Sequence, residues 1–373
     1  MENKLKQILF KVELEGRGVV NYDGNSQITF MNEHCGTKYF DNNYKCAKKA
    51  FYKKTDDITF WTDKNGKKYY DDMNYKLKIS SYCIKSAMFN DTMDGYNSNI
   101  TIDEDEFSHF ITSEYGLLRG FVGVDKKIQP YNKKSTLEMC DAIENSGAVI
   151  NMEIHTRNGN KDSTSDENST SLFFQENVGD TLYETKGCIN LKDMQFMSCD
   201  PEFGRLMFKP SWLEGEESLL HKQFMKHYGY IPYEEGYYKL STSTFSDKRG
   251  ERGIKLNNEF IVKLVKNLLK RILYTRISRS NAYAAVSKLQ IKLVDKQVFN
   301  PYNDDEGWID VNEDVIDNLN FDVFDFYTKC ENNEIEEYRK NMESLASEKQ
   351  EVRRLRNSTK KGNKDKDKGN TDK

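Results

Sequence analysis

The sequence has 373 residues, of which 37% are hydrophobic and 31% are charged, and its formal net charge is -4. This length allows one large domain or two, and the hydrophobic content suffices for a core. No stretch approaches the roughly 20 apolar residues of a membrane-spanning helix, and residues 1–12 lack the apolar core of a secretory signal. We therefore expect a globular, cytoplasmic protein with no membrane segment.

Seven cysteines are scattered over positions 35, 46, 83, 140, 188, 199 and 330, without a CxxC pair. An odd number at irregular spacing argues against a disulfide framework and against a zinc site. The five histidines also lack paired ligand spacing, and the chain has no P-loop, GxSxG or HExxH motif. We expect no metal, no cofactor and no catalytic residues, and a binding surface in place of an active site.

Charge is strongly segregated along the chain, although the total is close to zero. Residues 248–296 carry 13 Lys or Arg against three acids, a balance of +10. Residues 303–337 carry 13 acids against Lys329 alone, a balance of -12, and residues 351–373 carry nine basic residues against four acids, a balance of +5. Local fields of this size act on nucleic acid whatever the total charge. The composition is therefore compatible with a nucleic-acid partner.

The N-terminal part begins with an alternating stretch at residues 6–15, which predicts a first strand. Gly16-Arg17-Gly18 follows, and it either brings Arg17 close to a phosphate backbone or closes a plain hairpin. Residues 28–72, rich in Tyr, Phe, Lys and Asn, predict an inserted and mostly β region with a hairpin turn at residues 63–66.

The next feature is a strand-to-helix corner. A short alternating strand leads into Ser80 and Ser81, which can cap a helix that runs to residue 89. Free N–H groups at a helix start bind phosphate oxygens, and Lys78 and Lys85 flank this start. The corner predicts a phosphate site, with an ordinary capped helix and two solvated lysines as the alternative.

An apolar run after this corner is interrupted by Gly116 and Gly120, on either side of Arg119. Glycine costs about 1 kcal/mol in a helix interior. We therefore expect an irregular backbone here, held close to whatever Arg119 touches. Lys133 and Lys134 follow in a basic loop, for which plain solvation is the alternative.

Residues 148–155 and 171–176 predict strands on either side of the polar stretch at 156–171. Such a pair forms a hairpin that can project from the body. Phe173 and Phe174 on its second strand are either core residues or a stacking surface for a base.

In the rest of the chain we expect helices over residues 212–228 and 259–274, and strands over 187–191, 194–197, 237–245 and 289–294. A glycine-spaced basic loop at 248–253 precedes the second helix, and Arg271, Arg276 and Arg279 cluster where that helix ends. Apolar residues of 315–326 predict docking on a neighbour. Residues 334–356 predict a charged helix, and the low-complexity tail from 357 on is expected to be disordered.

Basic residues recur at the ends of predicted strands and helices, which favours one nucleic-acid-binding surface. The candidate RNA-binding residues are Arg17, Lys78, Ser80, Ser81, Lys85, Arg119, Lys133, Lys134, Phe173, Phe174, Arg249, Arg252, Arg271, Arg276 and Arg279.

The order of these elements resembles a known family. The Ile-Ser-Ser-x-x-Ile-Lys-x-Ala corner at residues 79–87 and the Leu-Leu-Arg-Gly at 117–120 are similar to the backbone subunits of CRISPR effector complexes. These are the RAMP-type Cas proteins, Cascade-like, that polymerise along a guide RNA. The stretch at 133–142 and the strands at 171–197 are similar to variant type I subunits.

That resemblance implies an α+β fold with a ferredoxin-like, RRM-related palm, inserted β-rich regions and a β-hairpin thumb. Residues 1–300 would form the palm, with a web or finger at about 22–75 and the thumb at about 150–200. An acidic segment with a charged helix at 301–350 and a disordered basic tail at 351–373 would follow. The implied partners are crRNA, target nucleic acid with DNA favoured over RNA, other Cas subunits, and further copies of this chain.

The implied function is non-catalytic and serves antiviral defence: the palm holds crRNA phosphates, thumbs kink the guide, and base pairing reads the target. Opposite charge on two segments can also pair copies head to tail in an open filament. Two alternatives remain open. One is a type III-like RNA-cleaving subunit that uses Asp23, for which a common Asp-Gly turn is the simpler explanation. The other is a phage or plasmid structural assembly protein.

Overall fold

The computed structural model describes about three fifths of the chain. The described residues are 4–18, 20, 22–25, 30–31, 38–39, 45–47, 49–51, 60–62, 68–70, 75–89, 104–123, 131–145, 151–158, 171–178, 180–201, 204–215, 218–241, 250–279, 282–296 and 306–331. Among them, side chains are described except at 22–76, 123, 151–178 and 279. The chain divides into two compact units, which we describe one at a time.

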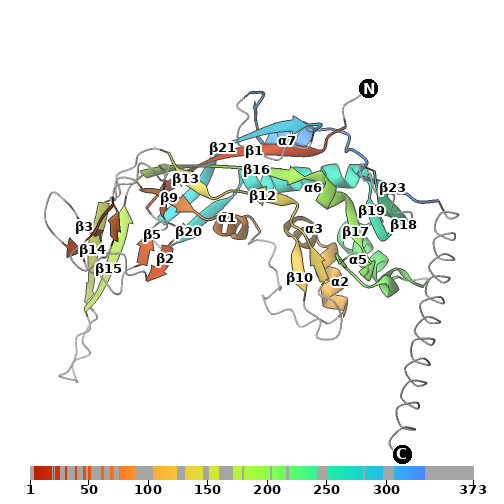
Figure 1. Cartoon of the computed structure of the whole chain (residues 1–373), viewed down its shortest axis with the longest axis horizontal. Coiled ribbons are helices and arrows are strands. Elements are labelled where there is room, and N and C mark those ends of the chain that lie inside the picture. Colours follow the sequence, from red (N-terminus) through yellow and green to blue (C-terminus); the bar gives the residue numbers. More distant parts are fainter. Residues whose placement is uncertain are drawn as a thin grey trace, which may run out of the picture. The chain divides into compact units, whose positions relative to one another are not determined.

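Unit 1 comprises residues 1–121, 134–194 and 258–324. Its central antiparallel strands are β1 (Gln7–Arg17), β16 (Asp180–Asn190) and β21 (Ala282–Val294), which run side by side in Figure 1. Within the described residues the sheet has the order β20-β21-β1-β16-β13-β9-β6, with β12 also on β16 and β22 also on β21. The outer strands are β6 (Lys49–Phe51), β9 (Tyr75–Ile79), β12 (Leu137–Met139), β13 (Ala142–Glu144), β20 (Arg276–Arg279) and β22 (Ile309–Asp310).

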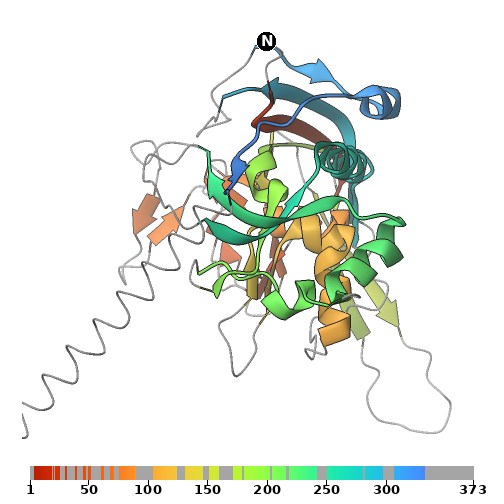
Figure 2. The ribbon, with the colours of Figure 1, turned by 90° about the vertical axis from the view of Figure 1, so that its right-hand side faces the viewer.

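The core of unit 1 reflects two patterns in the sequence, the alternation of apolar residues along β1 and their helical spacing along α6. Along β1 the even-numbered residues from Ile8 to Leu14 are at most 1% exposed, as expected for a strand with one covered face. Helix α6 (Asn258–Leu273) buries the stripe that includes Leu264, Val265 and Leu268, at helical spacing. Figure 2 shows α6 seen end-on beneath the strands β1 and β21. The predictions of the first strand and of this amphipathic helix are confirmed.

The other helices of unit 1 are short: α1 (Ser81–Met88), α2 (Glu104–Thr112), α3 (Glu114–Arg119), α4 (Leu191–Gln195), which ends one residue beyond the unit, and α7 (Glu313–Asn318). The expectation of irregular backbone between Gly116 and Gly120 was wrong, because residues 114–119 are helical. A Cβ at Gly116 would lie 2.3 Å from the Phe110 carbonyl oxygen, so α2 and α3 pack closely only with glycine there. Gly120 has φ +77° and ends α3.

Several short strand pairs belong to the predicted insertions: β2 (Tyr22–Asn25) with β5 (Lys45–Ala47), β3 (Phe30–Met31) with β4 (Lys38–Tyr39), β7 (Phe60–Thr62) with β8 (Lys68–Tyr70), and β14 (Asn151–Asn158) with β15 (Ser171–Val178). These antiparallel pairs confirm the predicted β region and both predicted hairpins.

Unit 2 comprises residues 122–133, 195–257 and 325–373. Its four strands, in the order β17-β19-β18-β23, are β17 (Phe196–Ser198), β19 (Glu251–Leu256), β18 (Tyr233–Leu240) and β23 (Tyr327–Lys329), counted over the described residues. It also has the 3-10 helix η5 (Pro210–Leu213) and α5 (Leu219–Tyr228), and the pair β10 (Phe121–Gly123) and β11 (Tyr131–Lys133) reaches into it.

Three boundaries differ from the predictions in this part of the chain. The expected helix at 212–228 is interrupted after Leu213, and the expected strand at 194–197 begins only at Phe196, after α4. The strand expected from 237 begins at Tyr233. The charged helix at 334–356 and the basic tail lie outside the described residues. No helix in the described part is long and apolar enough to cross a membrane.

Candidate nucleic-acid interface

The strand-to-helix corner has the predicted geometry. Ser80 is the N-cap of α1, with extended backbone angles, and its hydroxyl accepts a 3.4 Å hydrogen bond from Cys83 N–H. Ser81 N–H donates to Asp141 Oδ1 at 2.8 Å, and Lys78 Nζ lies 3.1 Å from Asp141 Oδ2. A carboxylate of the same chain therefore stands where the sequence predicts an anion.

Asp141 is held in its charged form at this corner. Partial burial on its own would raise the pKa of the carboxyl, but the hydrogen bonds from Ser81 N–H and Lys78 and the Lys78 charge lower it below the ordinary value. Lys78 and the start of α1 are thus already neutralised by one internal anion.

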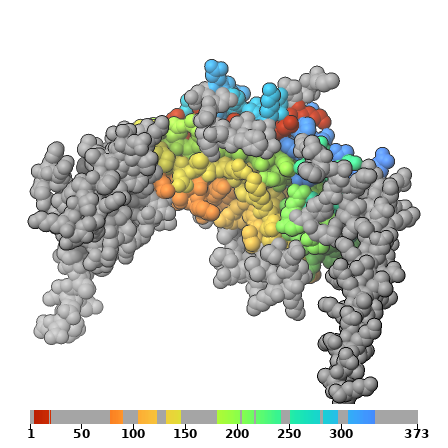
Figure 3. All heavy atoms as spheres, viewed as in Figure 1, coloured from red at the N-terminus to blue at the C-terminus, as the bar shows by residue number. Residues whose placement is uncertain are grey.

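Two further candidates, Lys85 and Arg119, lie near the strand β12. Lys85 Nζ donates to the Leu137 carbonyl at 2.8 Å, and burial lowers its pKa, helped by the Arg119 charge. Thr136 N–H and its hydroxyl both donate to the Leu118 carbonyl, at 3.2 and 2.9 Å, which ties α3 to this segment. Figure 3 shows the coloured segments of α1, in orange, and of residues 134–145, in yellow, side by side on one face.

Arg119 is partly covered by an aromatic ring. Its guanidinium carbon lies 5.0 Å from the centroid of the Tyr115 ring, and burial lowers its pKa. The structure thus brings Lys85 and Arg119 together, as the prediction of one surface requires.

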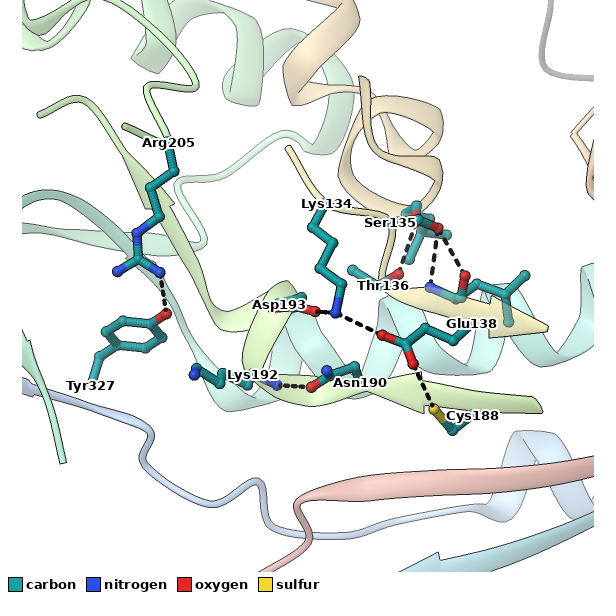
Figure 4. A network of polar contacts seen from close by, with 12 residues as sticks. Lys134, Ser135, Thr136, Glu138, Cys188, Asn190, Lys192, Asp193, Arg205 and Tyr327 are labelled. Atoms are coloured by element: carbon teal, nitrogen blue, oxygen red, sulfur yellow. Dashed lines mark hydrogen bonds and ion pairs between the residues drawn. The ribbon is translucent and has the colours of Figure 1, made fainter. Parts of the chain in front are cut away.

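Lys134 belongs to a polar network that Figure 4 shows. Its ammonium lies 2.7 Å from Glu138 and 3.2 Å from Asp193, and the hydrogen bond to Glu138 raises its pKa. The Cys188 thiol donates to the other Glu138 oxygen, and burial raises its pKa to about 12. Lys133, in contrast to Lys134, is 4% exposed.

The three arginines predicted to cluster after α6 separate in the structure. Arg271 Nε donates to Glu114 Oε1 at 2.8 Å, and its guanidinium lies over the Phe89 ring. This arginine joins α6 to α3. Arg276 is exposed on β20, and no ion pair joins it to another described residue. Arg279 ends the same strand, and its side chain is outside the description.

Arg17 ends β1 and is exposed. It lies directly opposite Tyr283 of β21 on one side and Asp180 of β16 on the other. Sequence reasoning missed Tyr283, which is 42% exposed and has the Arg276 guanidinium carbon 5.8 Å from its ring centroid. The sequence signal for Tyr283 is a tyrosine at the start of an alternating stretch, a few residues after Arg276 and Arg279.

The unit 2 candidates lie among acids. Arg252 lies 3.5 Å from Glu214 and 3.3 Å from Glu235, whereas Arg249 lies outside the described residues. A second arginine that the sequence did not indicate, Arg205, binds the buried Glu251 through Nε and Nη2. Burial alone would lower the pKa of Arg205, but the Glu251 bonds raise it.

Phe173 and Phe174 lie in β15, and their side chains are outside the description. Asp23 and Gly24 lie in the strand β2, where the pairing with β5 is irregular between Tyr22 and Asn25.

The acidic segment has partners within its own unit. Lys270 lies 2.7 Å from Asp317 and 3.5 Å from Glu313, and the hydrogen bond to Asp317 raises the pKa of Lys270. Lys288 lies 3.5 Å from Asp310, and Lys292 donates to the Glu306 carbonyl. We call residues 306–317 the acidic strap, because they neutralise lysines of α6 and β21. In the described residues, no group of three or more His, Cys, Asp or Glu could hold a metal ion.

Comparisons with known proteins identify a family for this chain. The family model "Type I-Fv CRISPR-associated protein Cas7fv-like" matches residues 4–347. Similar solved structures include a chain titled "CRISPR RNA-guided surveillance complex", with 9% identity, 76% of this chain and 68% of that chain covered and a TM-score of 0.33. Another, titled "CRISPR RNA-guided surveillance complex, pre-nicking", has 8% identity, covers 76% and 75%, and has a TM-score of 0.34. No curated protein sequence matches.

The family match defines the class as that of Cas7-like CRISPR backbone proteins. Within that class, the chain belongs to the type I-Fv Cas7fv-like family, whose model spans more than nine tenths of it. The predicted family resemblance is confirmed.

Proposed function

We propose that this protein is a non-catalytic backbone subunit of a CRISPR ribonucleoprotein effector. It polymerises along crRNA and presents the guide for pairing with target nucleic acid, DNA in preference to RNA, in antiviral defence. The observation that carries the proposal is the family match over residues 4–347. Sequence is then read by base pairing while the protein holds the backbone of the guide.

The order of strands in unit 1 supports a ferredoxin-like palm. Its four main strands, β1, β13, β16 and β21, have the sheet order β21-β1-β16-β13, with each neighbour antiparallel. The helices α1 to α3 come between the first and second of these strands in sequence, and α6 comes between the third and fourth. This is the βαββαβ arrangement of ferredoxin-like domains. The β pairs within residues 22–75 then form a web or finger, and β14 with β15 forms the thumb.

The RNA contacts of this proposal fall into two groups. Arg17 and Arg276 are exposed, and no ion pair joins either of them to another described residue; Arg279 follows on β20 and completes this group in the proposal. Lys85 and Arg119 form the second group, where a carbonyl and an aromatic ring orient the two cations. Arginine presents a planar donor fork that matches phosphate, so exposed arginines suit backbone contacts.

In the proposed filament, copies of the chain must contact one another by something other than pairing of the basic stretch with the acidic strap. Four lysines of the basic stretch already meet acids or carbonyls of the acidic strap within one chain: Lys266, Lys270, Lys288 and Lys292. Assembly along RNA would therefore depend mainly on the guide and on surfaces other than the acidic strap. Other Cas subunits are the remaining partners of the proposal.

The test is to express the chain with a guide-length RNA, purify the particle by size exclusion and treat it with nuclease. A regular ladder of protected RNA in a large particle is the expected result. Nucleic-acid-free monomer with no gain in size on adding RNA would overturn the proposal and favour a structural assembly protein.

A further inference from the structure

Three strands bring Tyr283, Arg276 and Arg17 to one face of unit 1. Tyr283 lies directly opposite Arg17 of β1, and residues directly opposite in an antiparallel pair point to the same face. Arg276 is opposite Ala285, two residues along β21 from Tyr283, so it shares this face. The 5.8 Å distance between the Arg276 guanidinium carbon and the Tyr283 ring centroid agrees with that placement.

The opposite face at this end of the sheet is closed. Ile277 is 5% exposed and Ala284 is fully buried. At Gly16 an added Cβ would lie 2.9 Å from the Tyr283 carbonyl oxygen, so β1 and β21 are packed tightly here. The ring of Tyr283 is therefore held by a rigid backbone on the solvent side, where it is 42% exposed.

The charges on this face are unequal on the two sides of the ring. Asp180 of β16 lies opposite Arg17, and Glu15 lies two residues along β1, opposite Ala285 of β21. No ion pair joins Arg17 to another described residue. On the β20 side the neighbours are Ser278, directly opposite Tyr283, and Arg276. A planar group on the ring would thus lie between two guanidinium groups, with a hydroxyl at its edge.

We propose that Tyr283, Arg276 and Arg17 form a stacking site for one unpaired base of single-stranded RNA. The base lies on the Tyr283 ring, and the two arginines bind the phosphates on either side. Every base has a π-face, so such a site tolerates any guide sequence. The inference rests on the proposed RNA-binding function and deepens it, because it assigns a base contact to a strand of the palm.

The test uses the full chain and single-stranded RNA carrying 2-aminopurine at successive positions, at low salt. Tyr283→Ala is expected to weaken RNA binding about 5- to 150-fold, which corresponds to about 1–3 kcal/mol. Tyr283→Phe keeps the ring and is expected to bind like the parent protein. Quenching of 2-aminopurine at regularly spaced positions is expected with the parent and the Phe variant, and its loss with the Ala variant.

Tyr274→Ala is the matched control, since Tyr274 is also an exposed tyrosine of unit 1 and hydrogen-bonds Glu313. It is expected to leave RNA affinity and quenching unchanged, and circular dichroism checks that each variant folds. Equal affinity and equal quenching for the parent and Tyr283→Ala would overturn the stacking site and leave the proposed function standing. A parent protein that binds no RNA would overturn both.

Discussion

Two basic regions of unit 1 carry similar charge but differ in what neutralises it. On α6 and β21, the lysines Lys270 and Lys288 contact carboxylates of the acidic strap within 3.5 Å. At the end of β1 and on β20, Arg17 and Arg276 form no ion pair with another described residue. A charge count along the sequence therefore overstates the surface that can attract phosphate.

The difference has a physical basis in side-chain chemistry as well as in pairing. Lysine offers a point charge that a strap of carboxylates and carbonyls can screen, whereas arginine offers a planar fork suited to phosphate and to aromatic faces. The acidic strap neutralises the lysines of α6 and β21, whereas Arg17 and Arg276 can still bind phosphate.

The largest expected change in RNA affinity comes from removing the charges of Arg17 and Arg276. Arg17→Gln with Arg276→Gln should lower RNA affinity at least tenfold at low salt, because two phosphate contacts are lost. Each contact to a single strand contributes about 0.7 to the slope of log affinity against log salt, so the slope should fall by about 1.4. Fluorescence anisotropy over a salt series measures both.

Lys266→Gln with Lys270→Gln is the matched control, because it removes the same charge from the region beneath the strap. We expect a less than twofold change in affinity. An equal loss from both double variants would contradict the contrast between the regions.

A smaller change, in the free energy of unfolding, is expected for Arg271, which is paired with Glu114. Arg271→Ala should lower the free energy of unfolding by about 2 kcal/mol, since Glu114 loses its charged hydrogen bond and Phe89 loses its cation. RNA affinity should stay within about twofold. Denaturant unfolding together with RNA titration separates the two readouts, and a loss of affinity without a loss of stability would reassign Arg271 to RNA contact.

Removing two acids of the acidic strap should leave Lys270 free to bind RNA. Glu313→Gln with Asp317→Asn frees Lys270, and we expect a gain of a few fold in binding to RNA of any sequence, with a steeper salt dependence. The gain should vanish when Lys266 and Lys270 are also replaced by Gln. Unchanged affinity and salt slope would mean that the strap does not screen these lysines from RNA.

The smallest effect is a pH dependence of stability at the α1 corner. Because the pKa of Asp141 is lowered in the folded state, its stabilisation is complete above the ordinary value of about 3.9 and is lost as pH falls through the lower folded value. Solvent screening keeps it below about 1 kcal/mol. Asp141→Asn should therefore be less stable than the parent at pH 6 and about equal at pH 2. A constant difference in thermal stability at both values would exclude this linkage.

Local patterns were sufficient for much of the fold. Alternation predicted β1, the Ser80 cap predicted the start of α1, and helical spacing predicted α6, because each pattern depends on neighbours within a few residues. The Gly116 expectation failed for a physical reason: the cost of glycine in a helix is about 1 kcal/mol, and close packing of α3 on α2 outweighs it.

The sequence predicted many residues of the candidate site but not the residues with which they pair. The sequence indicated Lys78 and Ser81, yet Asp141, which contacts both, is 60 residues from Ser81. Likewise Arg271 was grouped with Arg276, whereas its partner Glu114 is 157 residues away. Contacts over such separations depend on which strands pair and in what register, which no local pattern specifies.

The main strands and helices, their caps, the family to which the chain belongs and the number of basic residues could all be inferred from the amino-acid sequence. Which of these basic residues form ion pairs with distant acids, and which lie unpaired beside Tyr283, became clear from the folded chain. The reason is that helix and strand periods are set by bonded geometry and near neighbours, whereas a charge is screened by whatever the folded chain brings within a few ångströms of it.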